Sequence, residues 1–279
     1  SIFAFPSLDE GFGIPVLAQF AAFYVQFIRN TPLLVQIFFI FYGLPSIGIR
    51  LSLFWSGVSA GFAISLSVLC KGFFEAVLPK AEWTPAVSNL GYAVGFVVVI
   101  LGRMQLFTEN TITPILPLFL SPTAEKLART GMLWAIVFCA NMIGCALAAL
   151  VIVKLGVLPE PQMQGVLDLA RHHARAAALQ NLLHGAPAGF MIAALVWMLP
   201  SAEGAGKLLT ILLMTYMIGL GGLSHVVAGA TEYFILVWTG DMDLAKAVIG
   251  GILPALAGNV AGGTFLFAAL AYGQVKEEV

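Results

Sequence analysis

The stretch at residues 102–110 reads Gly-Arg-Met-Gln-Leu-Phe-Thr-Glu-Asn and lies in the middle of a long apolar segment. A second apolar segment is interrupted in the same way at residues 221–225, which read Gly-Gly-Leu-Ser-His. Non-helical backbone at membrane depth occurs only where protein or a water-filled cavity surrounds it. The two interruptions therefore predict a central pathway between two broken transmembrane helices.

The composition of the whole chain also indicates a membrane protein. Of its 279 residues, 60% are hydrophobic and 10% are charged, whereas soluble domains carry about a quarter charged residues. Six apolar stretches are long enough to cross a bilayer, at residues 53–78, 90–120, 131–155, 181–200, 207–239 and 247–272. We expect an all-α membrane protein with six transmembrane helices, the second and fifth broken. This composition argues against a soluble enzyme, and the net charge of −1 argues against a nucleic-acid partner.

The six segments form two similar halves. Residues 57–64 resemble residues 185–192, and Asn141-x-x-Gly144 corresponds to Asn259-x-x-Gly262. The two interruptions lie between these matches, in the same order. Because each half has three segments, an odd number, the second half enters the membrane upside down relative to the first. The sequence thus predicts two inverted three-helix repeats.

Other features carry less information about function. The total of lysine and arginine residues is the same on the two sides of the membrane, so the positive-inside rule gives no orientation. The first charges are Asp9 and Glu10, so we expect no signal peptide. The cysteines, which we expect to be small buried packing residues, are Cys70, Cys139 and Cys145. Neither a glycine-rich phosphate loop nor metal-ligand spacing is present, so we expect no enzyme activity, metal or cofactor.

The interruption at residues 105–110, Gln-Leu-Phe-Thr-Glu-Asn, resembles the Glu-Leu-Phe-Thr-Gly-Asn signature of the formate/nitrite transporter family. Asn141-x-x-Gly144, His225 and Gly258-Asn259-x-x-Gly262-Gly263 are similar to other motifs of that family, in the right order. The resemblance covers about residues 52–275. It implies an aquaporin-like protomer, a ring of five protomers, and one pore in each for a small monovalent anion such as formate, nitrite or hydrosulfide, often with a proton.

The chain departs from the family pattern at five positions. Two lie at the first interruption, where Gln105 replaces the usual Glu and Glu109 the usual Gly. The other three lie in the second half, where Ser224 replaces Glu, and Gly229 and Gly189 replace Asn. With these departures, the sequence resembles a divergent branch of the family whose members lack an assigned substrate.

Residues 1–51 form a separate apolar segment before this domain, and residues 276–279 form a short tail. Residues 24–54 resemble the permease subunit of a polar amino-acid ABC importer. Such a permease also needs a cytoplasmic Glu-Ala-Ala loop with a downstream glycine, and the sequence contains no such loop.

The candidate pathway residues come mainly from the two interruptions. An ionisable residue at membrane depth is by default functional, so His225 is expected to lend a proton to a weak acid in transit. The Thr108 hydroxyl is expected to donate a hydrogen bond to the anion, and Leu106 and Phe107 to form a hydrophobic constriction. Ser224 and Asn110 complete the expected pathway.

Further residues are expected at its edges. Arg103 either attracts anions at one mouth or binds nearby carbonyl groups or Glu109. Asn141 and Asn259, and Asn110 as the alternative to its pathway role, are expected to bridge backbone at the breaks and helix crossings. Glu232 shares a helical face with His225 and either lines the exit or extends to the headgroups. The run at residues 171–175 is expected to be a solvated loop.

The sequence thus predicts an integral membrane protein, of the bacterial inner membrane, that passes a small monovalent anion and a proton and assembles as a homopentamer. Two alternatives remain. An ABC importer permease would depend on ATP and a separate ATPase. A channel for a neutral solute such as water or glycerol would respond neither to pH nor to membrane potential.

Overall fold

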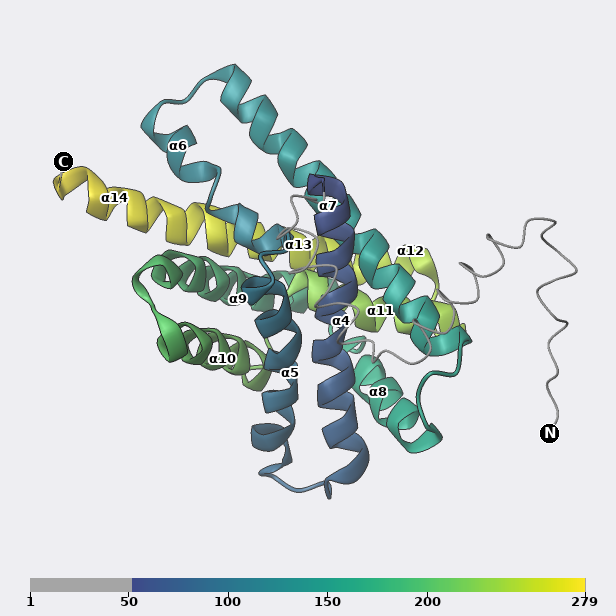
Figure 1. The fold of residues 1–279 in the computed structure, drawn as a ribbon. Helices are drawn as coiled ribbons and strands as arrows, with labels where there is room; N and C mark the ends of the chain where they lie inside the picture. Colours follow the sequence, from purple (N-terminus) through teal and green to yellow (C-terminus); the bar gives the residue numbers. More distant parts are fainter. Residues whose placement is uncertain (1–51, 279) are drawn as a thin grey trace, which may run out of the picture. The chain divides into compact units, whose positions relative to one another are not determined.

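A computed structural model describes residues 52–278, and the expected N-terminal segment lies outside them. All regular structure in this part of the chain is helical (Figure 1). The elements are α4 (Leu53–Val77), α5 (Thr84–Leu101), η3 (Phe107–Thr111), α6 (Ile115–Leu120), α7 (Ala124–Lys154), α8 (Glu160–His173), α9 (Ala178–Met198), η4 (Leu199–Ser201), α10 (Gly204–Leu220), α11 (Val226–Thr239), α12 (Leu244–Lys246), η5 (Ala247–Ile252), α13 (Leu253–Val260), η6 (Ala261–Ala268) and α14 (Ala269–Glu278).

Five helical segments in the described residues are long and apolar enough to cross a membrane. They are Leu53–Val77, Thr84–Leu101, Ala124–Lys154, Ala178–Ser201 and Leu244–Gln274. The remaining expected segment, 207–239, consists of two shorter apolar helices, α10 and α11, separated at residues 221–225. The expected break in the second segment lies between α5 and η3.

Five helices begin before the predicted apolar runs, and the difference is largest for α5 and α7. α5 starts at Thr84, and the proline that follows favours a first helical turn. α7 starts at Ala124, where the Thr123 hydroxyl accepts a hydrogen bond from the Lys126 N–H at 3.2 Å. A proline in the first turn of α5 and a hydroxyl cap on α7 therefore favour helix starts outside the part that hydropathy identifies.

One helix, α8, was not predicted at all. The run at residues 171–175, expected as a solvated loop, forms the last turn of α8 and the two residues after it. An acidic residue, Glu160, lies in the first turn and basic residues lie in the last, which complements the helix dipole. Val166, Leu169 and Ala170 are buried, so one face of α8 packs against the protein.

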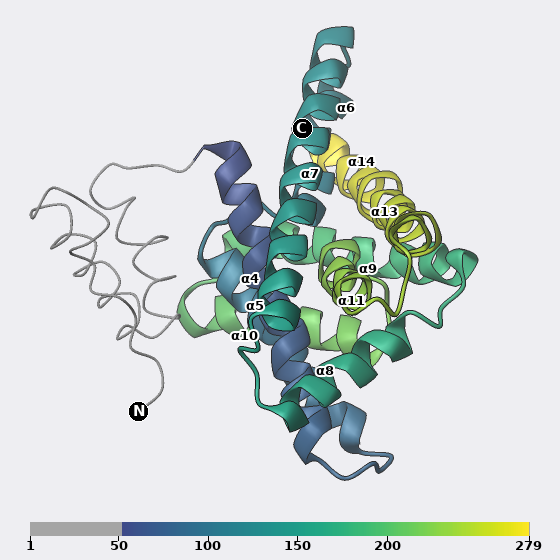
Figure 2. The same ribbon diagram turned by 90° about the vertical axis from the view of Figure 1, so that its right-hand side faces the viewer.

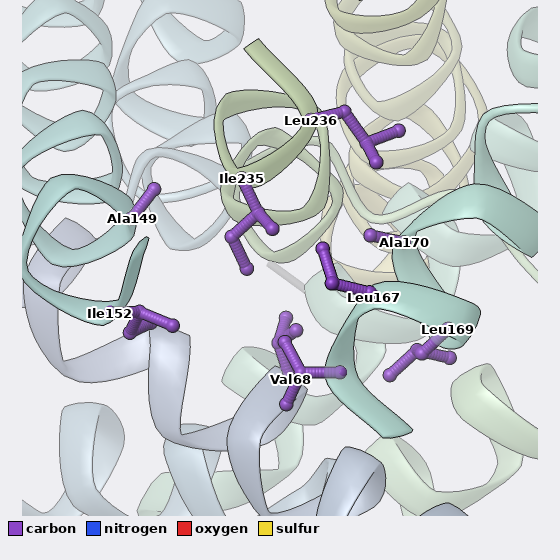
Figure 3. Packing of buried hydrophobic residues seen from close by; sticks show 9 residues of the cluster. Val68, Ala149, Ile152, Leu167, Leu169, Ala170, Ile235 and Leu236 are labelled. Atoms are coloured by element: carbon purple, nitrogen blue, oxygen red, sulfur yellow. The ribbon is translucent and has the colours of Figure 1, made fainter. Parts of the chain in front are cut away.

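α8 closes one end of the helix bundle around α11. Its buried residues meet side chains of α4, α7 and α11 in one apolar cluster (Figure 3). Members of this cluster are Val68, Ala149, Ile152, Val166, Leu167, Leu169, Ala170, Ile235 and Leu236. α11 also contacts η5 and α13, so it is surrounded by other helices (Figure 2).

Glycines allow two pairs of helices to cross at backbone contact. Where α4 crosses α7, a Cβ on Gly61 would overlap the Asn141 carbonyl group. Where α9 crosses α13, a Cβ on Gly189 would overlap the Asn259 carbonyl group in the same way. Small residues at such crossings let membrane helices approach closely. The two crossings bring both asparagines against the interruptions.

Candidate functional site

The first interruption follows α5. The Gly102 N–H donates to the Val98 carbonyl at 2.9 Å, and the Met104 N–H reaches back to Val99 at 3.0 Å. Between them Arg103 has a φ of 53°, in the left-handed region. The chain is then extended at Leu106 before η3 begins. A side-chain-bearing residue is uncommon in this conformation, so Arg103 is a point of backbone strain.

The second interruption has the same geometry. The Gly221 N–H donates to Met217 at 2.9 Å, and the Leu223 N–H reaches back to Ile218 at 3.0 Å. Gly222 holds the left-handed position, with a φ of 61°. The chain is extended at His225, and α11 begins with the next residue. The two breaks therefore share this backbone turn, with arginine in one and glycine in the other at the left-handed position, although the first continues as η3 and the second as α11.

Two fully buried asparagines hold these breaks with matching hydrogen bonds. The Asn141 Nδ2 group donates to the carbonyls of Gly57 (2.8 Å) and Gln105 (2.9 Å), and its Oδ1 accepts from the Phe107 N–H at 2.8 Å. The second set is equivalent. Asn259 donates to Gly185 at 2.9 Å and Ser224 at 2.7 Å, and it accepts from the Val226 N–H at 2.9 Å.

Thr108 and His225 meet between the two breaks. The Thr108 Oγ1 and His225 Nε2 atoms are 2.8 Å apart, and the two residues are 0% and 1% exposed. The His225 Nδ1 atom accepts a hydrogen bond from the Ala228 N–H at 3.2 Å. An accepting Nδ1 leaves the proton of the neutral ring on Nε2. His225 therefore donates to Thr108, whose own hydroxyl proton is available to another acceptor.

The neighbouring apolar side chains are tightly held. Leu106 and Phe107 are both buried. The Phe107 ring lies edge-on against Phe138, with centroids 5.3 Å apart, and against Trp134 at 6.0 Å. Phe96 packs edge-on against the His225 ring at 4.8 Å. The Thr108–His225 pair thus lies in an apolar environment.

Ser224 and Asn110 do not hydrogen-bond to this pair. The Asn110 Nδ2 group donates to the Leu106 carbonyl at 3.0 Å, within its own break. The Ser224 Oγ atom donates to Asn181 Oδ1 at 3.1 Å, and Asn181 donates to the Tyr233 hydroxyl at 2.9 Å. Asn181 and Tyr233 were not predicted as site residues; a buried asparagine within an apolar helix was the available signal.

Glu232 lies in a second polar cluster. It is 6% exposed, and its Oε2 atom is 3.3 Å from the His173 Nδ1 atom of α8. It therefore does not extend toward the headgroups, one of the two expectations for this residue. The His173 ring also packs against Tyr233, with centroids 5.1 Å apart. His173 was missed as a site residue because it was assigned to a loop.

Other sequence expectations have simpler outcomes. Within residues 52–278, Arg103 and Glu109 form no ion pair, and Arg103 is exposed. Cys145 is buried and Cys70 half-buried, but Cys139 is exposed, which corrects the expectation of three buried cysteines. Cys139 lies on α7, whose long apolar sequence continues onto faces that no other described helix covers. Residues 52–278 contain no cluster of three or more potential metal ligands.

These features define a helical membrane protein built around two broken helices. The sequence profile of the formate/nitrite transporter family matches residues 50–273. Inner membrane protein YfdC of Escherichia coli K12 is 34% identical over 229 residues, which are 82% of this chain and 74% of YfdC. The chain belongs to the formate/nitrite transporter family.

A solved structure described as a pentameric formate channel with formate bound has the same fold. It aligns with a TM-score of 0.71 at 18% identity, covering 81% of this chain and 96% of the channel. A separate short match is to the probable glutamine ABC transporter permease GlnP of Bacillus subtilis 168. It is 49% identical over 47 residues, which are 17% of this chain and 22% of GlnP.

Proposed function

We propose that this protein is a channel or proton-coupled transporter for a small monovalent anion such as formate, nitrite or hydrosulfide, with one pathway in each protomer. The buried Thr108–His225 hydrogen bond between the two breaks carries this proposal. Family membership and the likeness to a formate channel support the same class of solute.

In this proposal the anion binds the free hydroxyl proton of Thr108. The His225 Nε2–H group donates to the same oxygen and strengthens that hydroxyl as a donor. His225 also precedes the first residue of α11, where the helix dipole is positive. Arg103 attracts the anion at one mouth of the pathway. Ser224 and Asn110 bond within the protein and contribute to the pathway wall.

The anion crosses as its neutral acid. Leu106 and Phe107 form an apolar constriction that rejects a hydrated ion, and protonation removes most of the cost of burying its charge. His225 lends the proton when Nδ1 first gains one, which replaces the hydrogen bond from Ala228. The imidazolium then returns to neutral imidazole as its proton passes through Thr108 to the anion.

The proposed architecture is six transmembrane helices in two inverted three-helix repeats, within a homopentamer of the bacterial inner membrane. The equivalent breaks and the equivalent bonds of Asn141 and Asn259 support the repeat. The pentameric formate channel supports the assembly. The name of YfdC supports the inner-membrane location.

The two alternative functions differ in the observations that support them. A neutral-solute channel is favoured by one observation, the absence of a charged side chain from the Thr108–His225 contact. An importer permease has support only from a match to 17% of the chain, whereas the transporter family takes residues 50–273.

Proteoliposomes test the proposal directly. We expect purified protein to take up formate, nitrite or hydrosulfide faster when the outside is more acidic. Uptake should fail in His225→Ala and persist in the matched control His184→Ala, because His184 is exposed on α9. Uptake of glycerol or water alone, without any of the three anions, would favour the neutral-solute alternative. Normal anion uptake by His225→Ala would contradict the mechanism.

A further inference from the structure

Glu232 is a buried carboxylate within a transmembrane helix. Burying a carboxylate costs several kcal/mol unless charged or hydrogen-bonding partners compensate it. Its partner is His173, at 3.3 Å, on the helix that closes this end of the bundle. The breaks are held by Asn141 and Asn259, so the Glu232–His173 pair is not needed to hold them.

The pair lies on the same side of α11 as the central histidine. Positions four and seven residues after His225, Gly229 and Glu232, share its helical face. A Cβ on Gly229 would come within 2.8 Å of the His173 Nε2 atom, so the imidazole rests on the backbone there. One turn of α-helix rises about 5.4 Å, so His173 stands about one turn from the central site.

Several charged and titratable groups face Glu232 from the elements around it. Three basic side chains lie close enough to act on its carboxylate when they are protonated: His173 and His172 on α8 and Lys71 on α4. Lys71 also interacts with Glu75 of α4 and lies 5.9 Å from the Tyr92 ring centroid of α5. On α11 itself, Tyr233 is the neighbouring group. One carboxylate thus faces three basic side chains, so its charge is compensated when it is ionised.

The cluster lies between the partly exposed end of α8 and the second break. The side chains of His173 and Glu232 are 22% and 8% exposed, and His225 is 1% exposed. Hydrogen bonds from Ser224 to Asn181 and from Asn181 to Tyr233 link the second break to the residue that packs on His173. The Arg171–Asp241 ion pair, at 2.8 Å, fixes the end of α8 beside α11 and so holds His173 in place.

We propose that Glu232 and His173 form a second proton-binding site, which loads the pathway with protons on the side of α8. This inference rests on the proposed function. The His173 ring gains a proton from the acidic solution at its exposed edge and passes one from Nδ1 to the Glu232 carboxylate, which becomes a neutral acid as His173 returns to neutral imidazole. The neutral acid then transfers that proton to the arriving anion, which becomes a neutral weak acid, and the Glu232 carboxylate is restored beside the neutral His173 ring and Lys71. The site therefore binds protons and small carboxylate-like anions in turn.

Infrared titration of the reconstituted full-length protein tests the proton-binding step without transport. We expect acid to produce a carboxylic-acid carbonyl band that is missing in Glu232→Gln and titrates at a different pH in His173→Gln. Glu160→Gln, at the exposed start of the same helix, is the matched control and should keep the band. An identical band and titration in all four proteins would overturn the inference.

Formate uptake with a pH-sensitive dye inside the vesicles tests the transport step. We expect the acid stimulation of uptake to be roughly tenfold smaller in Glu232→Gln than in the unmodified protein. Glu160→Gln should show the same stimulation as the unmodified protein. Unchanged acid stimulation in Glu232→Gln would overturn the inference and leave the proposed function intact. If the unmodified protein carries no anion, the proposed function fails, and the infrared titration alone decides whether Glu232 and His173 bind a proton.

Discussion

At the scale of single residues, Arg103 carries strain that its counterpart Gly222 avoids. The left-handed conformation costs a side-chain-bearing residue about 1–2 kcal/mol, and glycine almost nothing. We expect Arg103→Gly to be neutral or to stabilise the fold by up to about 1 kcal/mol, because lost strain offsets glycine's greater entropy when unfolded. Gly222→Ala should destabilise by about 1 kcal/mol. Thermal unfolding in detergent measures both.

The same residue separates stability from transport. If Arg103 attracts anions, Arg103→Gly should slow formate uptake although the fold is no weaker, and Arg103→Lys should retain most of the rate. The strain would then be kept for its charge, as strained residues at functional sites often are. Equal uptake by both variants and the unmodified protein would assign Arg103 no role in the pathway.

Thr108 provides the sharpest test of the central contact. Thr108→Val keeps the shape of the side chain but removes the hydroxyl, which leaves the His225 Nε2–H group buried without an acceptor. We expect a loss of about 1–3 kcal/mol in unfolding free energy and of more than about tenfold in anion uptake. Thr108→Ser should restore both. Thr113→Val is the control, because that hydroxyl is exposed and bonds to the Glu109 carbonyl.

At the scale of helices, the two asparagine-held crossings should respond alike to the same change. Gly61→Ala and Gly189→Ala each place a methyl group against a carbonyl that cannot move without shifting an asparagine. We expect both to destabilise by about 1–3 kcal/mol, the usual cost of overpacking. Gly131→Ala in α7 is the control, because nothing lies within 4 Å of its Cβ position. A large effect at one crossing and none at the other would argue against equivalent halves.

The helices also mark the limit of prediction from sequence. Polar residues inside apolar stretches located both breaks, because backbone that leaves a helix inside a membrane must be surrounded by protein. Hydropathy did not identify α8, which is too polar to cross a membrane and packs through one face only. The pairing of His173 with Glu232 depends on where α8 packs, so the spacing of residues in the sequence could not predict it. The sequence predicted that Asn141 and Asn259 lie at the breaks, but it did not predict that they make equivalent sets of hydrogen bonds.

At the scale of the whole molecule, the alternation of sides follows from the number of crossings. With six crossings, the turn before α5 and the turn before α12 lie on one side of the membrane, and the turn before α10 lies on the other. If α10 and α11 instead enter and leave by the same face, the turn before α12 lies with the turn before α10. The balanced lysine and arginine count decides neither orientation.

Cysteine labelling distinguishes these arrangements. Lys80, Ser201 and Lys246 are exposed and lie in or beside these three turns, so each can be replaced by cysteine in a protein whose three native cysteines are serine. We expect a membrane-impermeant maleimide added outside intact cells to label either Ser201→Cys alone or both Lys80→Cys and Lys246→Cys. Permeabilised cells provide the control for reactivity. Labelling of Lys246→Cys together with Ser201→Cys would show that the second broken helix does not cross, and the inverted repeat would then be wrong. The proposed pathway needs the two broken helices to enter from opposite faces, so that their breaks meet at the same depth. That outcome would therefore also contradict the placement of the Thr108–His225 contact at the centre of the membrane.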